Sequence, residues 1–355
     1  MKHSIPRWII AVALLFHAPL LRADAPPIDP DDRPIEAPPI AIPKLEPRPF
    51  AWTKLALDLP PSIEVFNGDA VNSEGQIVRG WYASIDYSDA NLNARAVLSK
   101  APIGREPTSV LAAQNEALIA VNGGYFDMKG KPSKTFSTVM SDGQILAQNI
   151  AAASRANGKY FLTRGAFGIR ADRSFDVTWI AHFDNKVLCY PLPLPNTYAL
   201  PASPPSAAFP AGAREWDARE AIGGAPVLIE NGVDVSAWEA EAIPPDMALK
   251  THPRTAIGFT QAIDAKPSRL ILFVCDGRQP TWSRGLTLPE LTQTMRDLGC
   301  FEALNLDGGG SSTFVVRDAI LHRPTVLNRA SDGIERNITS IFAIVQNAPT
   351  PTVAQ

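Results

Sequence analysis

The sequence of 355 residues has few cysteines, little net charge and no long apolar run. Its three cysteines, Cys189, Cys275 and Cys300, lack the paired spacing of a zinc site. A net charge of −3 without a clustered basic stretch argues against nucleic-acid binding, because nucleic-acid-binding domains carry a basic face. We expect no stable membrane insertion, since no segment has the ~20 apolar residues that span a bilayer. The sequence indicates no oligomeric state.

The N-terminus has the pattern of a secretory signal peptide, which we place at residues 1–25. Lys2 and Arg7 flank the start of the apolar run of residues 8–15, and Ala23 and Ala25 resemble a cleavage site. Cleavage after Ala23 is an alternative, because Pro26 directly follows Ala25. A retained membrane anchor is the other interpretation, although the apolar run is short for one. We therefore expect an exported protein, either periplasmic or secreted.

An oxidising compartment makes Cys275 and Cys300 candidates for a disulfide, because both border predicted strands close to the site described below. Two buried free thiols are the alternative, since unpaired cysteines are usually buried. Cys189 has no partner in either case.

Proline divides the chain into regions of different character. Residues 26–49 are dominated by proline, so we interpret them as an extended linker that cannot form a core. One folded domain is expected over residues 50–346, followed by a flexible tail at 347–355. A second proline-rich stretch, residues 191–210, is interpreted as a long loop inside the domain and a candidate neighbour of the site.

Short segments rich in β-branched and aromatic residues predominate in this domain and predict strands. They are residues 95–100, 117–121, 160–164, 166–170, 174–179, 226–229, 269–274, 303–306, 313–316 and 338–345. Few helices are expected. Thr287 and Glu290 form a capping box before a helix that Gly299 ends, and residues 109–115 are a candidate for another.

The strongest candidate for a ligand site is the segment NLDGGGSS at residues 305–312. Asp307 follows a predicted buried strand, and three glycines then allow the backbone to approach a ligand closely. Backbone amides and hydroxyls in such a turn can bind an anion. The candidate site residues here are Asn305, Asp307, Gly308, Gly309, Gly310, Ser311 and Ser312. A tight turn without a ligand is the alternative, and a nucleotide P-loop is excluded because no Gly-Lys-Ser/Thr follows.

A second strand also ends in an aspartate, Asp276, which Gly277 and Arg278 follow. Asp276 and Asp307 at one end of a sheet would form a carboxylate pair, which suits proton transfer at a glycosidic oxygen. An ordinary Asp-Gly turn is the alternative for residues 276–277.

Weaker candidates lie elsewhere in the chain. Arg254 precedes an apolar run and is a candidate phosphate ligand, although a surface salt bridge is the commoner role of such a residue. Asn122 and Gly123 end the run ALIAV and are candidate sugar contacts, with Tyr125 or Phe126 stacking on the ring; a hairpin turn is the alternative. Arg336 is a further weak candidate.

No cofactor is indicated with certainty. The sequence has no His-x-x-x-His or similar metal-ligand spacing, and His182, His252 and His322 are isolated, so we interpret them as structural residues. A divalent cation bound by Asp127, Asp276 or Asp307 is left open.

Seven segments together resemble the phosphodiester glycosidase family and occur in the order typical of it. They are NGGYF at 122–126, GGAPVLI at 223–229, HPRTAIGF at 252–259, DGRQ at 276–279, GLTLPEL at 285–291, ALNLDGGGSSTFVV at 303–316 and ERNITSIFAIV at 335–345. The resemblance covers most of residues 80–345. It implies an α/β fold of the α+β type, with few helices around a mixed, largely antiparallel sheet.

The resemblance also implies a carbohydrate phosphodiester substrate, hydrolysed to a free sugar and a phosphomonoester. We expect Asp307, Asp276 and Arg254 to be catalytic, with Asp307 as nucleophile or general base and Asp276 positioning it or a water. Arg254, Arg278 and the amides of residues 308–310 would hold the phosphate. Two alternatives stay open: chemistry at phosphorus, by a phosphodiesterase or transferase, and a non-catalytic carbohydrate-binding module.

Overall fold

Antiparallel strand pairing organises the chain in the computed structural model, which describes residues 45–155, 158–184, 186–262, 268–318 and 323–347. These residues belong to one compact unit, Pro43–Gln355. The predicted signal peptide and most of the predicted linker lie outside the described residues. The first strand begins at Arg48, so the last two residues of the predicted linker, 48 and 49, belong to this strand instead.

The largest sheet has eight strands in the order β1-β2-β3-β19-β18-β20-β16-β17. Their bounds are β1 Arg48–Lys54, β2 Ile63–Val71, β3 Ile77–Asp86, β16 Val227–Glu230, β17 Val233–Asp234, β18 Arg254–Thr260, β19 Arg269–Cys275 and β20 Cys300–Asn305. Strands β18, β19 and β20 are almost wholly buried, since both faces of the sheet are covered at its centre.

Two further sheets complete the unit. The seven-stranded sheet has the order β14-β13-β12-β11-β15-β7-β8, and the five-stranded sheet has the order β22-β21-β6-β24-β4. The bounds are β14 Arg214–Glu215, β13 Lys186–Tyr190, β12 Phe175–Phe183, β11 Arg164–Ile169, β15 Glu220–Gly223, β7 Val139–Ser141, β8 Gln144–Ala147, β22 Pro324–Val326, β21 Phe314–Arg317, β6 Ala117–Asn122, β24 Ser340–Gln346 and β4 Leu92–Leu98. Two short pairs remain, β9 Ala152–Arg155 with β10 Gly158–Phe161 and β5 Glu106–Pro107 with β23 Asn337–Ile338.

Helices are few and short in the described part of the chain. They are α1 Thr108–Gln114, α2 Pro245–Leu249, α3 Leu288–Asp297 and the 3₁₀ turn η1 Gly309–Ser311. The capping box at α3 is confirmed: the Glu290 amide donates to Thr287 Oγ1 at 3.3 Å, and the Thr287 amide donates to Glu290 Oε2 at 2.8 Å. Gly299, with φ of 83°, follows the end of this helix. No helix within the described ranges is long and apolar enough to cross a membrane.

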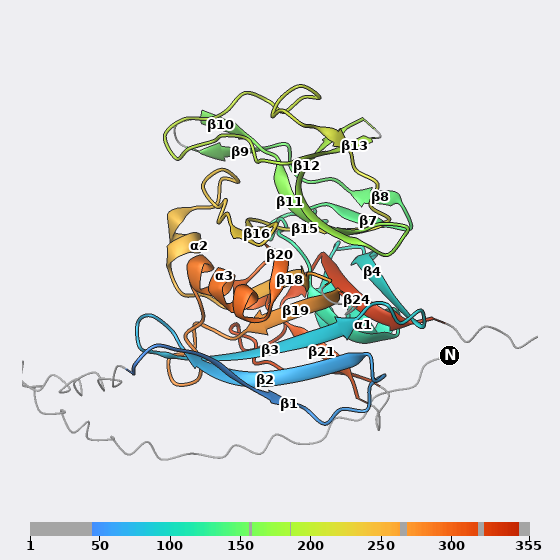
Figure 1. Cartoon of the computed structure of the whole chain (residues 1–355), viewed down its shortest axis with the longest axis vertical. Coiled ribbons are helices and arrows are strands. Elements are labelled where there is room, and N and C mark those ends of the chain that lie inside the picture. The colour runs from blue at the N-terminus through green and yellow to red at the C-terminus, as the bar shows by residue number, and fades with distance from the viewer. Residues whose placement is uncertain (1–44, 156–157, 185, 263–267, 319–322, 348–355) are drawn as a thin grey trace, which may run out of the picture. The chain divides into compact units, whose positions relative to one another are not determined.

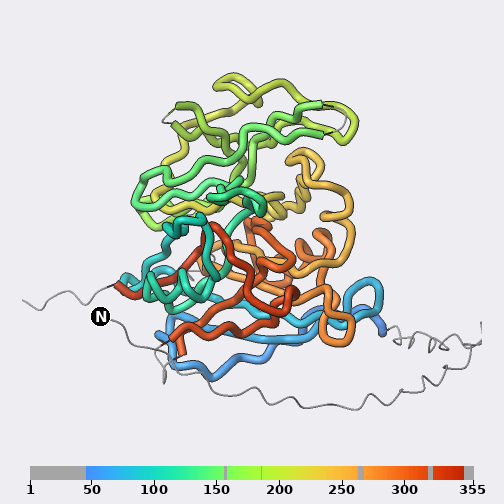
Figure 2. The backbone as a smooth tube through the Cα atoms, turned by 180° about the vertical axis from the view of Figure 1, so that it is seen from behind, coloured from blue at the N-terminus to red at the C-terminus, as the bar shows by residue number. Residues whose placement is uncertain are grey.

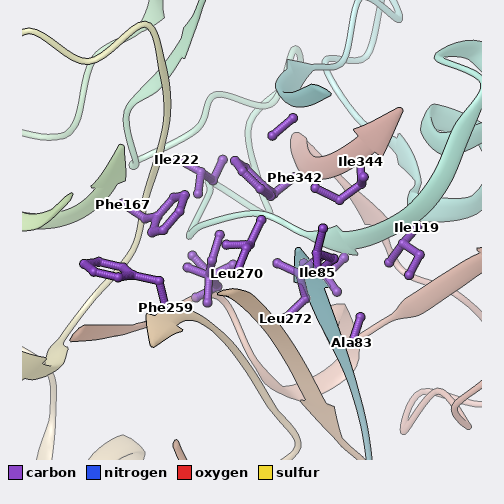
Figure 3. Close-up of a cluster of buried hydrophobic side chains, with 14 of the residues drawn as sticks. Ala83, Ile85, Ile119, Phe167, Ile222, Phe259, Leu270, Leu272, Phe342 and Ile344 are labelled. Carbon is purple, nitrogen blue, oxygen red and sulfur yellow. The ribbon is translucent and has the colours of Figure 1, made fainter. Parts of the chain in front are cut away.

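The alternation of side chains along β19 divides the interior into two cores. Leu270, Leu272 and Val274 belong to the core between the sheets, whereas Ile271 and Phe273 belong to the core beneath α3. α3 packs against β20, β16 and β18 (Figure 1). On the opposite face, Leu270 and Leu272 point toward Phe342, Ile344 and Ile222 of the other two sheets (Figure 3). Apolar residues on both faces explain why β19 is continuously apolar in sequence.

The C-terminal strands lie in the middle of the unit. Seen from behind, β21, β24 and the strands around β19 (orange to red) lie between β1–β2 (blue) and the β9–β13 region (green) (Figure 2). All pairings between the described strands are antiparallel, from β1–β2 at one sheet edge to β7–β8 at another. The predicted architecture, largely antiparallel with few helices, is confirmed.

The disulfide candidate is wrong, since Cys189, Cys275 and Cys300 are all buried free thiols. Cys275 lies opposite Arg254 at the start of β18, whereas Cys300 lies opposite Thr260 at its end. Six residues of strand separate these positions by roughly 20 Å, since a strand rises ~3.3 Å per residue. A disulfide tolerates a Cα separation of about 7 Å at most.

The proline-rich loop of residues 191–210 connects β13 to β14. The Leu194 amide donates to Thr163 Oγ1, and Asn196 Nδ2 donates to the carbonyl oxygens of Phe161 and Ala240. Pro204 and Pro205 line a small cavity beside His182. The loop therefore does not line the candidate active site described next, contrary to the expectation that it flanks it.

Candidate active site

The start of β18 and the C-terminal ends of β19 and β20 lie side by side, at one end of the strands of the eight-stranded sheet. β18 runs antiparallel to both β19 and β20, so Arg254 at its start lies opposite Cys275, and Ala256 lies opposite Asn305. The chain leaves β19 at Asp276 and leaves β20 toward Asp307 at this same end. The register of β18 therefore brings residues from three distant parts of the sequence together.

A pocket of about 330 Å³ lies at this end of the strands. Its lining residues are Tyr125, Phe126, Met128, Met247, His252, Pro253, Arg254, Arg278, Asp307, Gly308, Gly309 and Arg336. The lining contains three arginines and one carboxylate. Asp332 pairs with Arg336 at 2.7 Å, but Arg254 and Arg278 have no ion-pair partner among the described residues, so the pocket has a positive charge that suits an anionic ligand. Cavities of about 460 and 470 Å³ elsewhere contain none of the predicted site residues, so they are not the candidate site.

Asp307 is held firmly by its backbone while its carboxylate lines the pocket. Its amide donates to the Gly123 carbonyl at 3.1 Å, and its carbonyl accepts from Asn122 Nδ2 at 2.7 Å. Burial raises the pKa of Asp307 to about 6, although Ser311, Arg336, the Gly308 amide and Arg278 all act to lower it. A carboxylate that titrates near neutrality suits a nucleophile or a general base.

Arg254 is a buried cation whose orientation is set by carbonyl groups. Its Nε donates to Leu286 O at 2.8 Å, and its Nη2 donates to Met247 O at 2.8 Å and Lys250 O at 3.1 Å. Burial lowers its pKa to about 10, so it stays charged at neutral pH. Because Nε and Nη2 already have acceptors, a bidentate phosphate clamp by Arg254 is not available, and Nη1 is its free donor group among the described residues.

His252 orients the second arginine of the pocket. Arg278 Nε and Nη2 lie 3.2 and 3.1 Å from His252 Nδ1, and His252 Nε2 lies 3.0 Å from the Asp246 carbonyl. Nδ1 must accept, so the proton of the ring belongs on Nε2. Burial and the nearby arginines lower the pKa of His252, which keeps the ring neutral. The sequence interpretation of His252 as a structural residue missed that it lines the pocket.

Each of the three consecutive glycines makes room for a different neighbour. A Cβ on Gly308 would lie 2.6 Å from the Pro253 carbonyl oxygen, and one on Gly309 would lie 2.8 Å from Arg278 Nη1. One on Gly310 would collide with Asp332 and Arg336, whose side chains form an ion pair of 2.7 Å. The triplet therefore lets Arg278 and Arg336 lie directly against the backbone beside Asp307.

The amides of Gly308 and Gly309 do not form the expected phosphate cradle. The Gly308 amide donates to Asp307 Oδ1 at 2.9 Å, and the Gly309 amide donates to Pro253 O at 3.0 Å. The amides of Ser311 and Ser312 close the 3₁₀ turn by donating to Gly308 O and Gly309 O. Of the groups predicted to hold a phosphate, the arginine side chains therefore line the pocket, whereas the amides of Gly308 and Gly309 are already hydrogen-bonded.

Asn122 does not line the pocket but hydrogen-bonds to other chain segments around it. It is fully buried; its Oδ1 accepts from Thr255 Oγ1 at 2.7 Å and from the Thr313 amide at 3.1 Å, while its Nδ2 donates to Asp307 O. Gly123 is also buried, and a Cβ there would lie 2.3 Å from Ser340 Oγ. The expectation that Asn122 and Gly123 contact the substrate is therefore not supported by their positions.

Asp276 is also buried behind the pocket. Its carboxylate accepts from Trp282 Nε1 at 2.7 Å, from Asn328 Nδ2 at 2.9 Å and from the Arg329 amide at 3.0 and 3.1 Å. Asn328 in turn binds Ser312 O and the Phe314 amide. Asp276 therefore connects to the segment after the glycines through Asn328, which fits the expected positioning role but not direct proton transfer to a ligand.

Asn305 supports an aromatic wall of the pocket. Its Nδ2 donates to the Tyr125 hydroxyl at 3.0 Å and to Ala225 O at 2.6 Å, and the Tyr125 hydroxyl donates to the same carbonyl. Burial, and secondarily the charge of Asp307, raises the pKa of Tyr125 to about 12. Tyr125 thus presents a fixed, neutral ring. Asn305, Gly310, Ser311 and Ser312 are all buried and do not line the pocket.

The described residues contain no group of three or more His, Cys, Asp and Glu side chains arranged to hold a metal ion. Asp127, Asp276 and Asp307 have separate surroundings: Asp127 Oδ1 accepts from the Lys129 amide, Asp276 is enclosed as described, and Asp307 faces the arginines. The three carboxylates considered for a cation do not converge.

The model of the phosphodiester glycosidase family matches residues 115–345. The chain belongs to this family. Phosphodiester glycosidases are hydrolases, so the class of enzyme predicted from the ordered motifs is confirmed. N-acetylglucosamine-1-phosphodiester alpha-N-acetylglucosaminidase of Mus musculus is 29% identical over 217 residues, which cover 58% of this chain and 33% of that protein. The human protein of the same name is 38% identical over 72 residues, or 20% of this chain and 13% of its own length. The matches thus span a third or less of these relatives.

Two solved structures show the same fold as this phosphodiester glycosidase. The catalytic domain of zebrafish N-acetylglucosamine-1-phosphodiester alpha-N-acetylglucosaminidase, described as auto-inhibited by its pro-peptide, has a TM-score of 0.53 and 20% identity, over 84% of this chain and 89% of that one. A hypothetical protein from Synechocystis has a TM-score of 0.52 and 16% identity, over 84% and 68%.

Four lining residues were not predicted from the sequence as site residues: His252, Pro253, Met128 and Met247. His252 and Pro253 directly precede Arg254, so their place in the motif HPRT was an available signal. Met128, in a loop, and Met247, in α2, carry no comparable signal, because an isolated methionine usually indicates packing.

Proposed function

We propose that this chain is an exported hydrolase that cleaves the bond between the anomeric carbon of a sugar and a phosphodiester. One observation carries the proposal: a half-buried carboxylate with a pKa of about 6, Asp307, faces three arginines in one pocket. Such a pocket combines charge compensation for a phosphate with a group able to act at the adjacent carbon.

In the proposed reaction the arginines bind the phosphate and stabilise its negative charge. Arg278 and Arg336 are oriented by His252 and Asp332, and Arg254 by backbone carbonyls, so their charges are in place before substrate binds. Negative charge grows on the phosphate oxygen as the bond to the sugar breaks, and preorganised cations stabilise that charge. Since a phosphate is already a good leaving group, the reaction needs no strong general acid.

In the proposed reaction Asp307 acts at the anomeric carbon. As the sole carboxylate among the described lining residues, it either attacks that carbon or deprotonates the water that does. The bond from the anomeric carbon to the phosphate oxygen breaks, and its electron pair stays on the phosphate. Water supplies the new hydroxyl of the sugar and a proton, which gives a free sugar and a phosphomonoester.

The relatives and the walls of the pocket support the proposed substrate class. N-acetylglucosamine-1-phosphodiesters are named for the mammalian relatives and are the first compounds to test. Tyr125 and Phe126 provide an aromatic wall against which a sugar ring can pack. The basic and apolar N-terminal segment supports export to the periplasm or the medium, where envelope glycans linked through phosphodiesters occur.

The test is hydrolysis of N-acetylglucosamine-1-(methyl phosphodiester) by the purified protein, with Asp307→Asn as the test variant and Asp58→Asn, an exposed aspartate outside the pocket, as its matched control. We expect turnover by the wild type and the control and at least a 10³-fold lower kcat for Asp307→Asn. Equal turnover by both variants would remove Asp307 from the mechanism.

Reaction in ¹⁸O-labelled water distinguishes the bond that breaks. Label in the released sugar supports attack at carbon. Label in the phosphate instead indicates a phosphodiesterase, and cleavage without label in either product indicates a transferase; the same arginines could bind the phosphate in both cases. Binding without turnover by the wild type indicates a non-catalytic carbohydrate-binding module.

A further inference from the structure

A loop rich in lysine adjoins the pocket but takes no part in the chemistry proposed above. Residues 127–134, here called the lysine loop, carry Lys129, Lys131 and Lys134, all of which are exposed. Residues 125, 126 and 128, at and just before the start of the loop, line the pocket. The loop therefore begins at the rim of the pocket.

Contacts to the rest of the domain give the lysine loop a defined conformation. The Asp127 amide donates to Lys134 O at 2.8 Å, and the Ser133 amide donates to Ile103 O at 2.9 Å. Arg105 Nη1 donates to Met128 O at 2.8 Å, and the Ser133 hydroxyl donates to Asp127 O. The lysines are thus carried by a braced turn, which lowers the entropic cost of using them together.

The positive charge of the lysine loop is not neutralised within the protein. Among the ion pairs of the described residues, none includes Lys129, Lys131 or Lys134. Asp127, the one carboxylate of the loop, contacts its backbone: Oδ1 accepts from the Lys129 amide, and Oδ2 would be 2.7 Å from a Cβ placed on Gly130. Arg105 adds a further cation behind the loop. A local excess of positive charge stands out on a chain whose net charge is −3.

We propose that the lysine loop is a second anion-binding surface, which holds a neighbouring phosphate when the substrate is a chain of repeated sugar-1-phosphodiester units. The inference rests on the proposed function for the pocket and adds the polymeric nature of the substrate. With one phosphodiester among Arg254, Arg278 and Arg336, the adjacent anionic repeat leaves the pocket past Met128 and meets the lysines. Their contribution is electrostatic and therefore falls as salt rises.

The experiment compares two substrates, N-acetylglucosamine-1-(methyl phosphodiester) and an oligomer of four N-acetylglucosamine-1-phosphodiester repeats. The test variant is Lys129→Gln/Lys131→Gln/Lys134→Gln. The matched control is Lys54→Gln/Lys159→Gln/Lys186→Gln, which removes the same charge from exposed lysines of β1, β10 and β13. We expect the test variant to lose about tenfold in kcat/KM on the oligomer and under twofold on the methyl ester. Its salt dependence on the oligomer should also weaken, and the control should match the wild type.

Two kinetic results would overturn the proposal: equal losses on both substrates, or the same oligomer defect in the control. If the wild type hydrolyses neither substrate, the proposed function fails, and fluorescence anisotropy with labelled oligomer still tests the loop. Equal oligomer affinities for wild type and test variant then reject it. Reduced binding to phosphatidylglycerol vesicles with unchanged oligomer affinity would assign the lysines to a membrane instead and also reject it.

Discussion

The proposed mechanism needs Asp307 in its charged form, but that charge lowers the stability of the folded protein. The substitution Asp307→Asn can reveal this opposition. Burial raises the pKa of this carboxyl from 3.8 to about 6, so the folded protein binds its proton more tightly than the unfolded chain does. Below pH 4 the group is protonated in both states and has no effect. Between pH 4 and pH 6 stability falls as pH rises, because the folded state must hold a charge in a poorly solvated position.

The magnitude follows from the size of the shift. One pKa unit corresponds to 1.36 kcal/mol, so ionised Asp307 costs the folded state about 3 kcal/mol at pH 7 and above. Asp307→Asn removes this cost while keeping a side chain of similar size. For a domain of about 300 residues, 3 kcal/mol corresponds to about 5 °C in melting temperature.

The assay is the melting temperature of wild type and Asp307→Asn by differential scanning calorimetry at pH 4, 5, 6, 7 and 8. We expect the variant to gain about 5 °C over the wild type between pH 4 and pH 7 and no more above pH 7. Other buried carboxyls, such as Glu302 with a pKa of about 7, titrate in both proteins and cancel in the difference. A difference in melting temperature that does not change with pH would refute the assigned desolvation of Asp307.

Three other predictions concern residues that position the side chains and backbone of the site. Gly309→Ala adds a Cβ 2.8 Å from Arg278 Nη1 at a φ of 63°, so we expect a loss of about 1 kcal/mol in unfolding free energy and a raised KM; an unchanged KM would contradict the packing argument. Asn122→Ala leaves buried partners on Thr255, Thr313 and Asp307 unpaired, which should cost about 2–4 kcal/mol in urea unfolding, and an unchanged midpoint would speak against it. His252→Ala releases Arg278, so kcat/KM should fall about tenfold while the acidic limb of its pH profile stays in place; loss of that limb would mean that His252, not Asp307, titrates there.

Many buried strands could be predicted because burial leaves a continuous apolar run in the sequence. The apolar runs at β6, β19 and β24 and the capping box of α3 marked these elements to within a few residues. The strands β1–β3 gave no such signal. β2 contains Asn67-Gly68, a dipeptide typical of turns, yet Gly68 lies mid-strand, where a Cβ would be 2.5 Å from Ala51 O. Local propensity indicates a turn there, whereas packing against β1 requires the glycine.

The candidate site was predicted as a set of motifs, but not in its internal order. Strand ends rich in Gly, Asp, Asn and Arg correctly indicated where chain segments meet. Which side chains face the pocket depends on partners far away in sequence: Trp282 and Asn328 enclose Asp276, and Thr255 encloses Asn122. The amides of Gly308 and Gly309 likewise donate to Asp307 itself and to Pro253. Such pairings are set by tertiary contacts and leave no local pattern in the sequence.

The three thiols also have a practical consequence for measuring motion in this enzyme. Cys189, Cys275 and Cys300 are buried, and burial raises the pKa of each, so few thiolates are present to react with maleimides at neutral pH. A cysteine introduced on the surface would therefore be labelled selectively in the otherwise native chain. Fluorophores placed in this way at the rim of the pocket can report substrate arrival without a cysteine-free background.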